Sequence, residues 1–425
     1  MIENNRIIII DDNEDDLKKL SKVFHDHGIG CKSFIYDGFN FPTPMLGVRF
    51  AFFDIHLNQD SNVNSTLKDA ISHYISVDNG PFVLIFWSSN TNKIEDFIEF
   101  VNRTNDEFKN KLKPILLEAI DKSEFIEKNN RLEEKLDSIL SKDIAQCLIK
   151  FDEEILIAAR QTLDNLLQII PYGNKWGDAT EFNENCKKVF SKIAEASYGL
   201  TRAKANPDAA IRECILPILE NILSHNSQIY WKEYLTPLQN ACKPNELKFP
   251  SNFSTATLNS VFHVTTCVEQ CTKEERGAVC CIIKEKRENI FNTLFKISLE
   301  EWLRIIVKNP DEELQNNTKI VGIEISASCD FSQDKKRTKK YILGAIIPVS
   351  TQINKNTPDY VYQLPAIKYN DQEYIILVNF NYTFVESNEN QFLDSPLFVL
   401  RKEMMDLIGN KYANHISRIG ITSFR

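Results

Sequence analysis

The 425-residue sequence contains no apolar run long enough to cross a bilayer, and the residues after Met1, IENNR, do not form a signal sequence. Its ten cysteines are scattered and lack the paired C-x-x-C spacing of zinc sites. A long chain without a secretion signal normally keeps its thiols reduced. We therefore expect a cytoplasmic protein without a membrane span.

Broad positive charge is also lacking. The net charge is −9, which argues against general attraction to nucleic acid or to anionic membranes. Two short basic runs, KEKRE (284–288) and KKRTKK (335–340), are interpreted as solvated loops. The sequence has no Walker-type loop, no H-E-x-x-H and no G-x-S-x-G motif, and no helix–turn–helix is evident. We expect neither nucleic acid nor a membrane among its partners.

The first 125 residues alternate strand-like and helix-like segments. Five strands are predicted: IIII (7–10), which is all apolar and β-branched, CKSFIY (31–36), VRFAFFD (48–54), PFVLIFWSS (81–89) and PILLEAIDK (114–122). Helical spacing predicts helices at 15–28, around 66–77, and at 93–112. The last strand segment also has helix-forming residues, so a helix there is the alternative. The alternation predicts an α/β domain over residues 1–125, with a doubly wound, flavodoxin-like sheet of five parallel strands.

Glycine is absent from residues 81–172 and proline from 115–170, and apolar residues recur there at three- and four-residue steps, from Leu132 to Ile155. This pattern predicts one long helix or two in sequence, ending at PYGNKWG (171–177). We assign residues 126–245 to a helical region. Its apolar seam can bury against the rest of the chain or against a second copy, so a homodimer through this region is one prediction.

The last third, residues 246–425, predicts a mixed α+β, β-rich domain. Strands are expected at GAVCCIIKE (277–285), KIVGIEISASCDFS (319–332), YILGAIIPVS (341–350) and EYIILVNFNYTFVES (373–387). A short helix is expected at 298–309, with Ser298 as its cap and Glu301 at the reciprocal position. The segment 395–418 is expected to close with a helix.

Polar residues stand where the predicted parallel strands end. They are Asp11 and Asp12 after the first strand, Asp54 after the third, Ser88 after the fourth and Lys122 after the fifth. The carboxyl ends of parallel strands meet over one edge of the sheet, so these side chains are expected to converge. Three carboxylates repel one another unless a cation lies among them, and Mg²⁺ suits oxygen ligands. An aspartate in such a site can attack a phosphoryl group, and the hydroxyl and ammonium can bind its oxygens.

This order of residues resembles the receiver domain of bacterial two-component response regulators, over roughly residues 5–125. The resemblance implies that Asp54 accepts a phosphoryl group from a histidine kinase. It implies that Asp12, helped by Asp11, holds Mg²⁺, with a main-chain carbonyl near His56 as a further ligand. It also implies that Ser88 is the switch hydroxyl and that Lys122 is the phosphate-binding lysine.

The sequence departs from the receiver pattern in three places. Ser123 follows the lysine where receivers usually have proline, and Ala119 stands where an aromatic residue is usual. The interval from Ser88 to Lys122 is longer than usual, which implies an extended fourth helix. Lys113, followed by proline, is the alternative for the lysine, because its local match and spacing are closer to the family. We favour Lys122, because a strand is expected to precede it.

The remainder of the chain offers weaker signals. IEISASCDFSQDK (323–335) resembles a segment, I-x-x-S-x-x-C-D-x-x-Q-x-K, of other bacterial proteins, and this resemblance implies no activity. Cys329 and Asp330 within it are candidates for a nucleophile or a metal ligand, and a buried structural thiol is the alternative. His263, Cys267 and Cys271 share a helical spacing, with Cys280 and Cys281 shortly after, but the paired C-x-x-C spacing familiar from zinc sites is absent.

The large remainder without a DNA-binding motif resembles the receiver proteins of two-component-like anti-phage systems such as Detocs. In those systems one receiver protein serves as a phosphate sink. We therefore expect a phosphorelay protein that is a sink or regulator in defence, with a second receiver or an effector protein as a further partner. The alternatives are an effector enzyme whose activity lies around Cys329 and Asp330, switched by the receiver, and a scaffold with a degenerate receiver.

Overall fold

The computed structural model forms two compact units, Met1–Leu166 with Ile218–Glu246, and Leu167–Pro217 with Leu247–Arg425. The structure describes residues 6–57, 62–89, 93–104, 107–125, 134–136, 138–139, 141–173, 175, 177–225, 235–243, 246–265, 271–308, 310–326, 339–354, 356–386 and 391–417.

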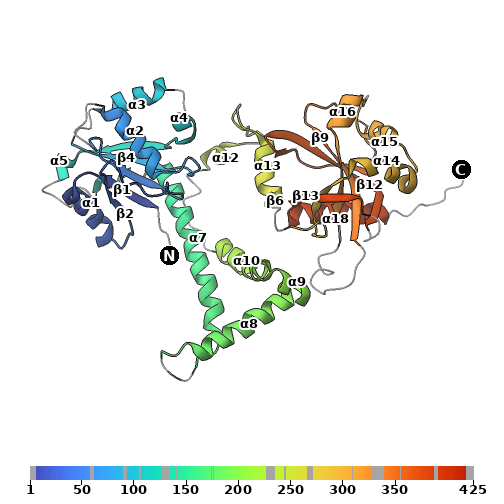
Figure 1. Ribbon diagram of the computed structural model, residues 1–425, viewed down its shortest axis with the longest axis horizontal. Helices are drawn as coiled ribbons and strands as arrows, with labels where there is room; N and C mark the ends of the chain where they lie inside the picture. The colour runs from blue at the N-terminus through green and yellow to red at the C-terminus, as the bar shows by residue number, and fades with distance from the viewer. Residues whose placement is uncertain are drawn as a thin grey trace. The chain divides into compact units, whose positions relative to one another are not determined.

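The first unit contains the predicted parallel sheet (Figure 1). Its strands are β1 (Ile7–Asp11), β2 (Lys32–Ile35), β3 (Phe50–Phe53), β4 (Val83–Trp87) and β5 (Leu116–Ile120). They pair in parallel in the order β2-β1-β3-β4-β5, which is the flavodoxin-like order. The segment before Lys122 is therefore a strand and not a helix.

Helices cover both faces of this sheet, which explains the uninterrupted isoleucines of β1. Ile7 and Ile9 pack with the buried side of α1 (Glu14–Asp26), including Leu20. Ile8 and Ile10 pack on the other side, with α2 (Val63–Tyr74) and α3 (Ile94–Arg103). Burying an isoleucine side chain contributes about 1.5–3 kcal/mol, so these four residues anchor the centre of the sheet.

The helix predicted over 93–112 is two helices, α3 and α4 (Glu107–Lys111). Thr104 ends α3 in an extended conformation (φ −84°, ψ 143°), and its hydroxyl donates to the carbonyl of Val101. Lys109 then reaches back to the carbonyl of Asn102 at 2.6 Å. The implied extended fourth helix is therefore wrong: the extra residues form a second short helix. They precede the start of β5, at the edge of the sheet away from the strand carboxyl ends.

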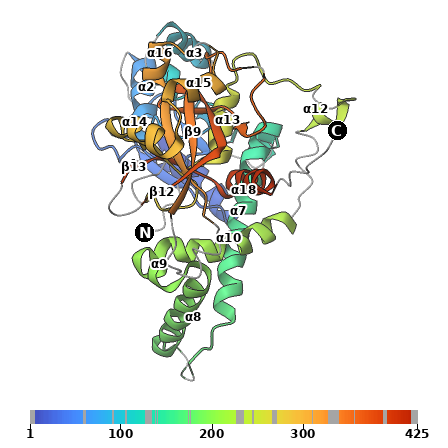
Figure 2. The same ribbon diagram turned by 90° about the vertical axis from the view of Figure 1, so that its right-hand side faces the viewer.

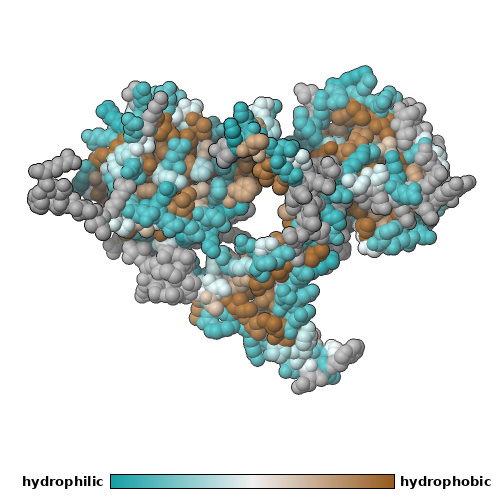
Figure 3. Space-filling view, turned by 180° about the vertical axis from the view of Figure 1, so that it is seen from behind, coloured by the Kyte–Doolittle hydropathy of each residue, from teal (hydrophilic) through white to brown (hydrophobic). Residues whose placement is uncertain are grey.

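Helices follow the sheet, and the longest of those described lies in the stretch that lacks glycine and proline. They are α5 (Lys122–Phe125), α7 (Asp143–Gln168), α8 (Thr180–Tyr198), α9 (Leu200–Ala205), α10 (Pro207–His225) and α12 (Thr236–Asn240). Asp152 of α7 accepts a hydrogen bond from Arg49 at 3.2 Å, which ties this helix to the sheet. Leu200 and Leu216 are exposed on the later helices, and brown surface lies over this region in Figure 3. The homodimer stays a prediction.

The second unit holds an antiparallel sheet in the order β10-β12-β9-β8-β7-β13-β6, with β11 paired to β12. Its strands are β6 (Val264–Thr265), β7 (Ala278–Ile282), β8 (Lys319–Glu324), β9 (Lys339–Pro348), β10 (Val361–Gln363), β11 (Ile367–Tyr369), β12 (Gln372–Glu386) and β13 (Leu393–Leu400). The closing helix, α18 (Lys402–Ile416), is shorter than the segment 395–418, because residues up to Leu400 belong to β13.

Helical segments cover both faces of this second sheet (Figures 1 and 2). On one face lie η3 (Ile290–Phe295), α15 (Leu299–Ile306) and α16 (Glu312–Asn317), with the short segments η2 (Lys284–Lys286) and α14 (Arg287–Asn289) leading into η3. On the other face α18 packs through Met404, Met405 and Ile408. α13 (Thr255–His263) packs along β11. The predicted cap of α15 is confirmed: Glu301 N donates to Ser298 Oγ at 3.1 Å, and Ser298 N donates to the Glu301 carboxylate. Among the helices that the structure describes, none is both long enough and apolar enough to span a bilayer.

Candidate functional site

The carboxyl ends of β1 and β3 bring three acids together. Asp11 is the last residue of β1, and Asp54 directly follows β3, its main-chain N–H donating to Ile10 on the neighbouring strand at 3.0 Å. Carboxylate oxygens of Asp11, Asp12 and Asp54 all lie within 4.8 Å of one another. Asp11 and Asp54 are buried, whereas Asp12 is exposed. This cluster has the donor type and spacing that could hold a hard metal ion.

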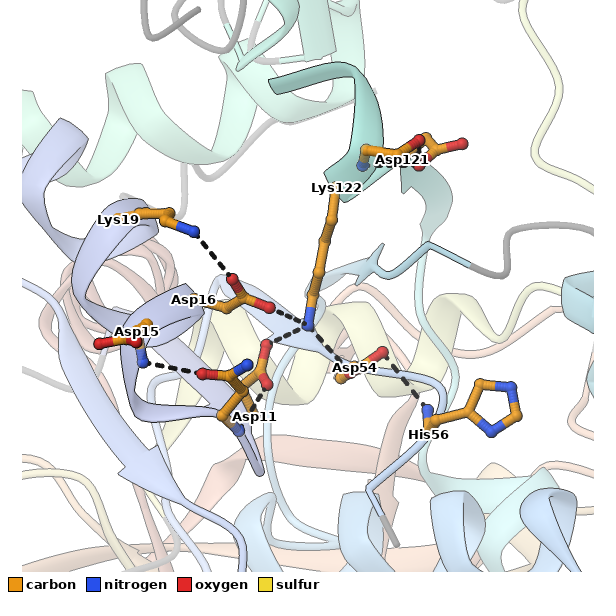
Figure 4. A network of polar contacts seen from close by, with 10 residues as sticks. Asp11, Asp15, Asp16, Lys19, Asp54, His56, Asp121 and Lys122 are labelled. Atoms are coloured by element: carbon orange, nitrogen blue, oxygen red, sulfur yellow. Dashed lines mark hydrogen bonds and ion pairs between the residues drawn. The ribbon is translucent and has the colours of Figure 1, made fainter. Parts of the chain in front are cut away.

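The ammonium of Lys122 lies against the same acids (Figure 4). Its Nζ is 2.5 Å from Asp11 Oδ2, 2.9 Å from Asp54 Oδ2 and 3.3 Å from Asp16 Oδ2. The side chain is only 5% exposed, so the carboxylates, and not water, compensate its charge.

Local hydrogen bonds fix the backbone at Lys122 without the proline usual in receivers. Asp121 Oδ1 accepts from the N–H and from the hydroxyl of Ser123, at 2.9 and 2.6 Å. The N–H of Lys122 itself donates to the carbonyl of Ser88 at 3.3 Å. The alternative lysine, Lys113, is exposed in the segment between α4 and β5. The structure therefore brings Lys122, and not Lys113, to the acids.

Ser88 directly follows β4 and is buried, with its N–H donating to the carbonyl of Ile120 at 3.1 Å. The preceding Trp87 is also buried, and its indole N–H has no hydrogen-bond partner among the described residues. His56 donates its main-chain N–H to Asp54 Oδ1 at 3.3 Å, and its imidazole points away from the acids (Figure 4). The metal-binding role of its carbonyl stays a prediction.

Burial dominates the electrostatics of these groups. It raises the pKa of Asp11 to about 6, although the contacts with Lys122 oppose the rise. Burial, followed by the charge of Asp54, raises the pKa of Asp12. For Lys122 burial acts to lower the pKa, but the charges of Asp54 and Asp11 outweigh it, and the pKa is raised. A divalent cation among the carboxylates would stabilise their charged forms against this burial.

Asp16 is the member of the site that the sequence analysis missed. It lies in the first turn of α1, after the N-cap Asn13, and four residues beyond Asp12. The signal that was available was the short spacing between Asp16 and the strand-end acids, since Asp12 itself precedes α1. Acids in a first helical turn are common for another reason, the favourable interaction with the helix dipole, so the spacing alone did not distinguish Asp16.

Some candidate residues lie outside the part of the chain that the structure describes. They are Cys267, Cys329 and Asp330. The nucleophile hypothesis therefore stays a prediction, and the helix face expected to join His263 to the later cysteines is wrong, because α13 ends at His263 and Val264–Thr265 form a strand.

No protein-family model matches the chain, and comparisons with curated proteins and with solved structures gave no significant match. The flavodoxin-like sheet with its cluster of Asp11, Asp12 and Asp54 is compatible with a receiver domain.

Proposed function

We propose that the N-terminal domain is a phosphoacceptor receiver in which Asp54 takes a phosphoryl group from a histidine kinase. The observation that carries the proposal is the convergence of the buried ammonium of Lys122 with Asp11 and Asp54, two members of a cluster that could hold a metal ion. In this arrangement the Asp54 carboxylate is the nucleophile, and it already contacts the Lys122 ammonium, which can stabilise the negative charge on the phosphoryl oxygens.

The proposed transfer uses these groups in order. An Asp54 carboxylate oxygen attacks phosphorus as the P–N bond to the kinase histidine breaks, and the bonding electrons remain on the imidazole, which takes a proton. Asp11, Asp12 and Asp54 would hold the ion, which supplies charge neutralisation for the phosphoryl oxygens. Lys122 leaves Asp54 for a phosphoryl oxygen, and Ser88 donates its hydroxyl to another.

Acetyl phosphate tests the proposal without the kinase. The full chain, incubated with acetyl phosphate and Mg²⁺, should gain the mass of one phosphoryl group. Asp54→Asn and the wild type with excess EDTA should gain none. Asp15→Asn, which removes an exposed acid nearby, should behave as the wild type. A wild type that is never modified, or an Asp54→Asn chain modified equally, would overturn the proposal.

We further propose that the chain stores or relays the phosphoryl group, as a sink or regulator in anti-phage defence, and has no DNA-binding output. The net charge of −9 supports the lack of DNA binding. The phosphomimic Asp54→Glu should then be harmless when expressed in bacterial cells. Growth arrest that Cys329→Ala abolishes would instead support the receiver-controlled effector enzyme.

A further inference from the structure

Asp16 contacts Lys122 but does not belong to the metal-binding cluster. Its Oδ2 is 3.3 Å from the Lys122 ammonium, and its Oδ1 is 3.4 Å from the ammonium of Lys19. The Asp16 side chain is 16% exposed. In Figure 4 it approaches the Lys122 ammonium from the α1 side, and Asp54 approaches from the other side.

Lys122 and a bound metal would compete for the same carboxylates. Asp11 Oδ2 is 2.5 Å from Nζ, and Asp11 and Asp54 are both members of the cluster of possible ligands. When these two carboxylates bind the metal, the Lys122 ammonium loses much of the negative charge that compensates it. Its side chain is almost fully buried, so water cannot replace what it loses, and an uncompensated buried charge is costly.

We propose that Asp16 is a positioning residue, which retains the Lys122 ammonium when Asp11 and Asp54 turn to the metal. This inference rests on the proposed function and adds a residue to its machinery. Asp16 is suited to the role because it belongs to a helix whose start is fixed: Asn13 Oδ1 accepts the N–H of Asp15 at 2.9 Å. It therefore stays in place while the strand-end acids change partners.

Asp15 provides a matched control. It lies in the same first turn of α1, is exposed, and its carboxylate has the same charge. Asp15→Asn and Asp16→Asn thus remove equal charge from the same helix end, with equal expected effect on the helix dipole. The Asp16 carboxylate is the one that contacts Lys122.

The test is calorimetric titration of the full chain with Mg²⁺ alone. Asp16→Asn should bind Mg²⁺ about five-fold more weakly than Asp15→Asn, the size expected for loss of a partly buried charged contact. The difference should persist in 0.5 M NaCl, where the screening length is roughly 4 Å. Asp16→Glu, which keeps the carboxylate, should restore most of the affinity. Circular dichroism checks that each variant is folded.

Equal Mg²⁺ affinities for Asp16→Asn and Asp15→Asn would overturn this inference, and phosphorylation of Asp54 by acetyl phosphate would still stand as the separate test of the proposed function. A wild type that binds no Mg²⁺ would overturn both.

Discussion

Replacing Asp11 with asparagine is expected to make the metal-free protein more stable at neutral pH. Asp11 is 0% exposed, and burial raises its pKa from 3.8 to about 6. The folded state therefore holds a proton on this carboxyl more tightly than the unfolded chain does. Between about pH 4 and pH 6 the unfolded chain binds fewer protons, so stability falls as the pH rises.

The size of the stabilisation follows from the pKa shift of Asp11. One pH unit of pKa difference equals about 1.4 kcal/mol, so the charged Asp11 costs the folded state about 3 kcal/mol above pH 6. Asparagine removes this cost and keeps an oxygen for Lys122. In EDTA at pH 7.5 we expect Asp11→Asn to raise the free energy of unfolding of the N-terminal sheet by up to about 3 kcal/mol. At pH 4 the gain should fall below about 1 kcal/mol, because Asp11 of the wild type is then protonated when folded.

Hydrogen exchange of peptides from β1 and β4, read by mass spectrometry, measures this unit separately from the rest of the chain. Wild type, Asp11→Asn and Asp15→Asn are compared at each pH, so the intrinsic exchange chemistry cancels. The reasoning fails if Asp11→Asn gives no more protection than Asp15→Asn at pH 7.5, or if its gain is the same at pH 4.

Three further predictions concern residues of the second unit, the last with Cys242 of the first unit as its exposed reference. Glu386 is buried, accepts two main-chain N–H groups and pairs with Lys273 at 2.9 Å, so Glu386→Ala should cost about 3–5 kcal/mol; an unchanged thermal melting temperature would contradict this. Ser298→Ala removes one half of a capping box and should cost about 1 kcal/mol, seen as a lower urea midpoint; a midpoint that does not move would show that the cap contributes nothing. Burial raises the pKa of the Cys280 thiol to about 12, so iodoacetamide at pH 8 should modify the exposed Cys242 and spare Cys280 until urea is added; early labelling of Cys280 would contradict the burial.

The centre of the parallel sheet and its acids could be predicted because β1, β3 and β4 are buried on both faces and read as apolar runs. The polar residue directly after each run then marks the edge where the site forms. The contact of Asp16 with Lys122 could not be predicted in this way, because it depends on how close the first turn of α1 lies to the residue that begins α5. The break between α3 and α4 has a signal in retrospect: Asn102 and Thr104 are poor helix formers.

The second sheet shows a different limit. Its strand order places β13 beside β7, although more than a hundred residues separate these strands in the chain. The alternation of apolar residues indicates that such strands exist, but not which of them become neighbours. Parallel strands linked by helices are restricted to a few orders, whereas long-range antiparallel pairing leaves many.

The buried indole of Trp87 gives the chain an optical probe of its own. It directly precedes Ser88, and its ring centroid lies 6.4 Å from that of Phe125, next to the short helix that Lys122 begins. With the other three tryptophans changed to phenylalanine, a single emitter would remain beside Ser88. Movement of the hydroxyl toward a new phosphoryl group would then be visible as a change in emission, in real time and without a label.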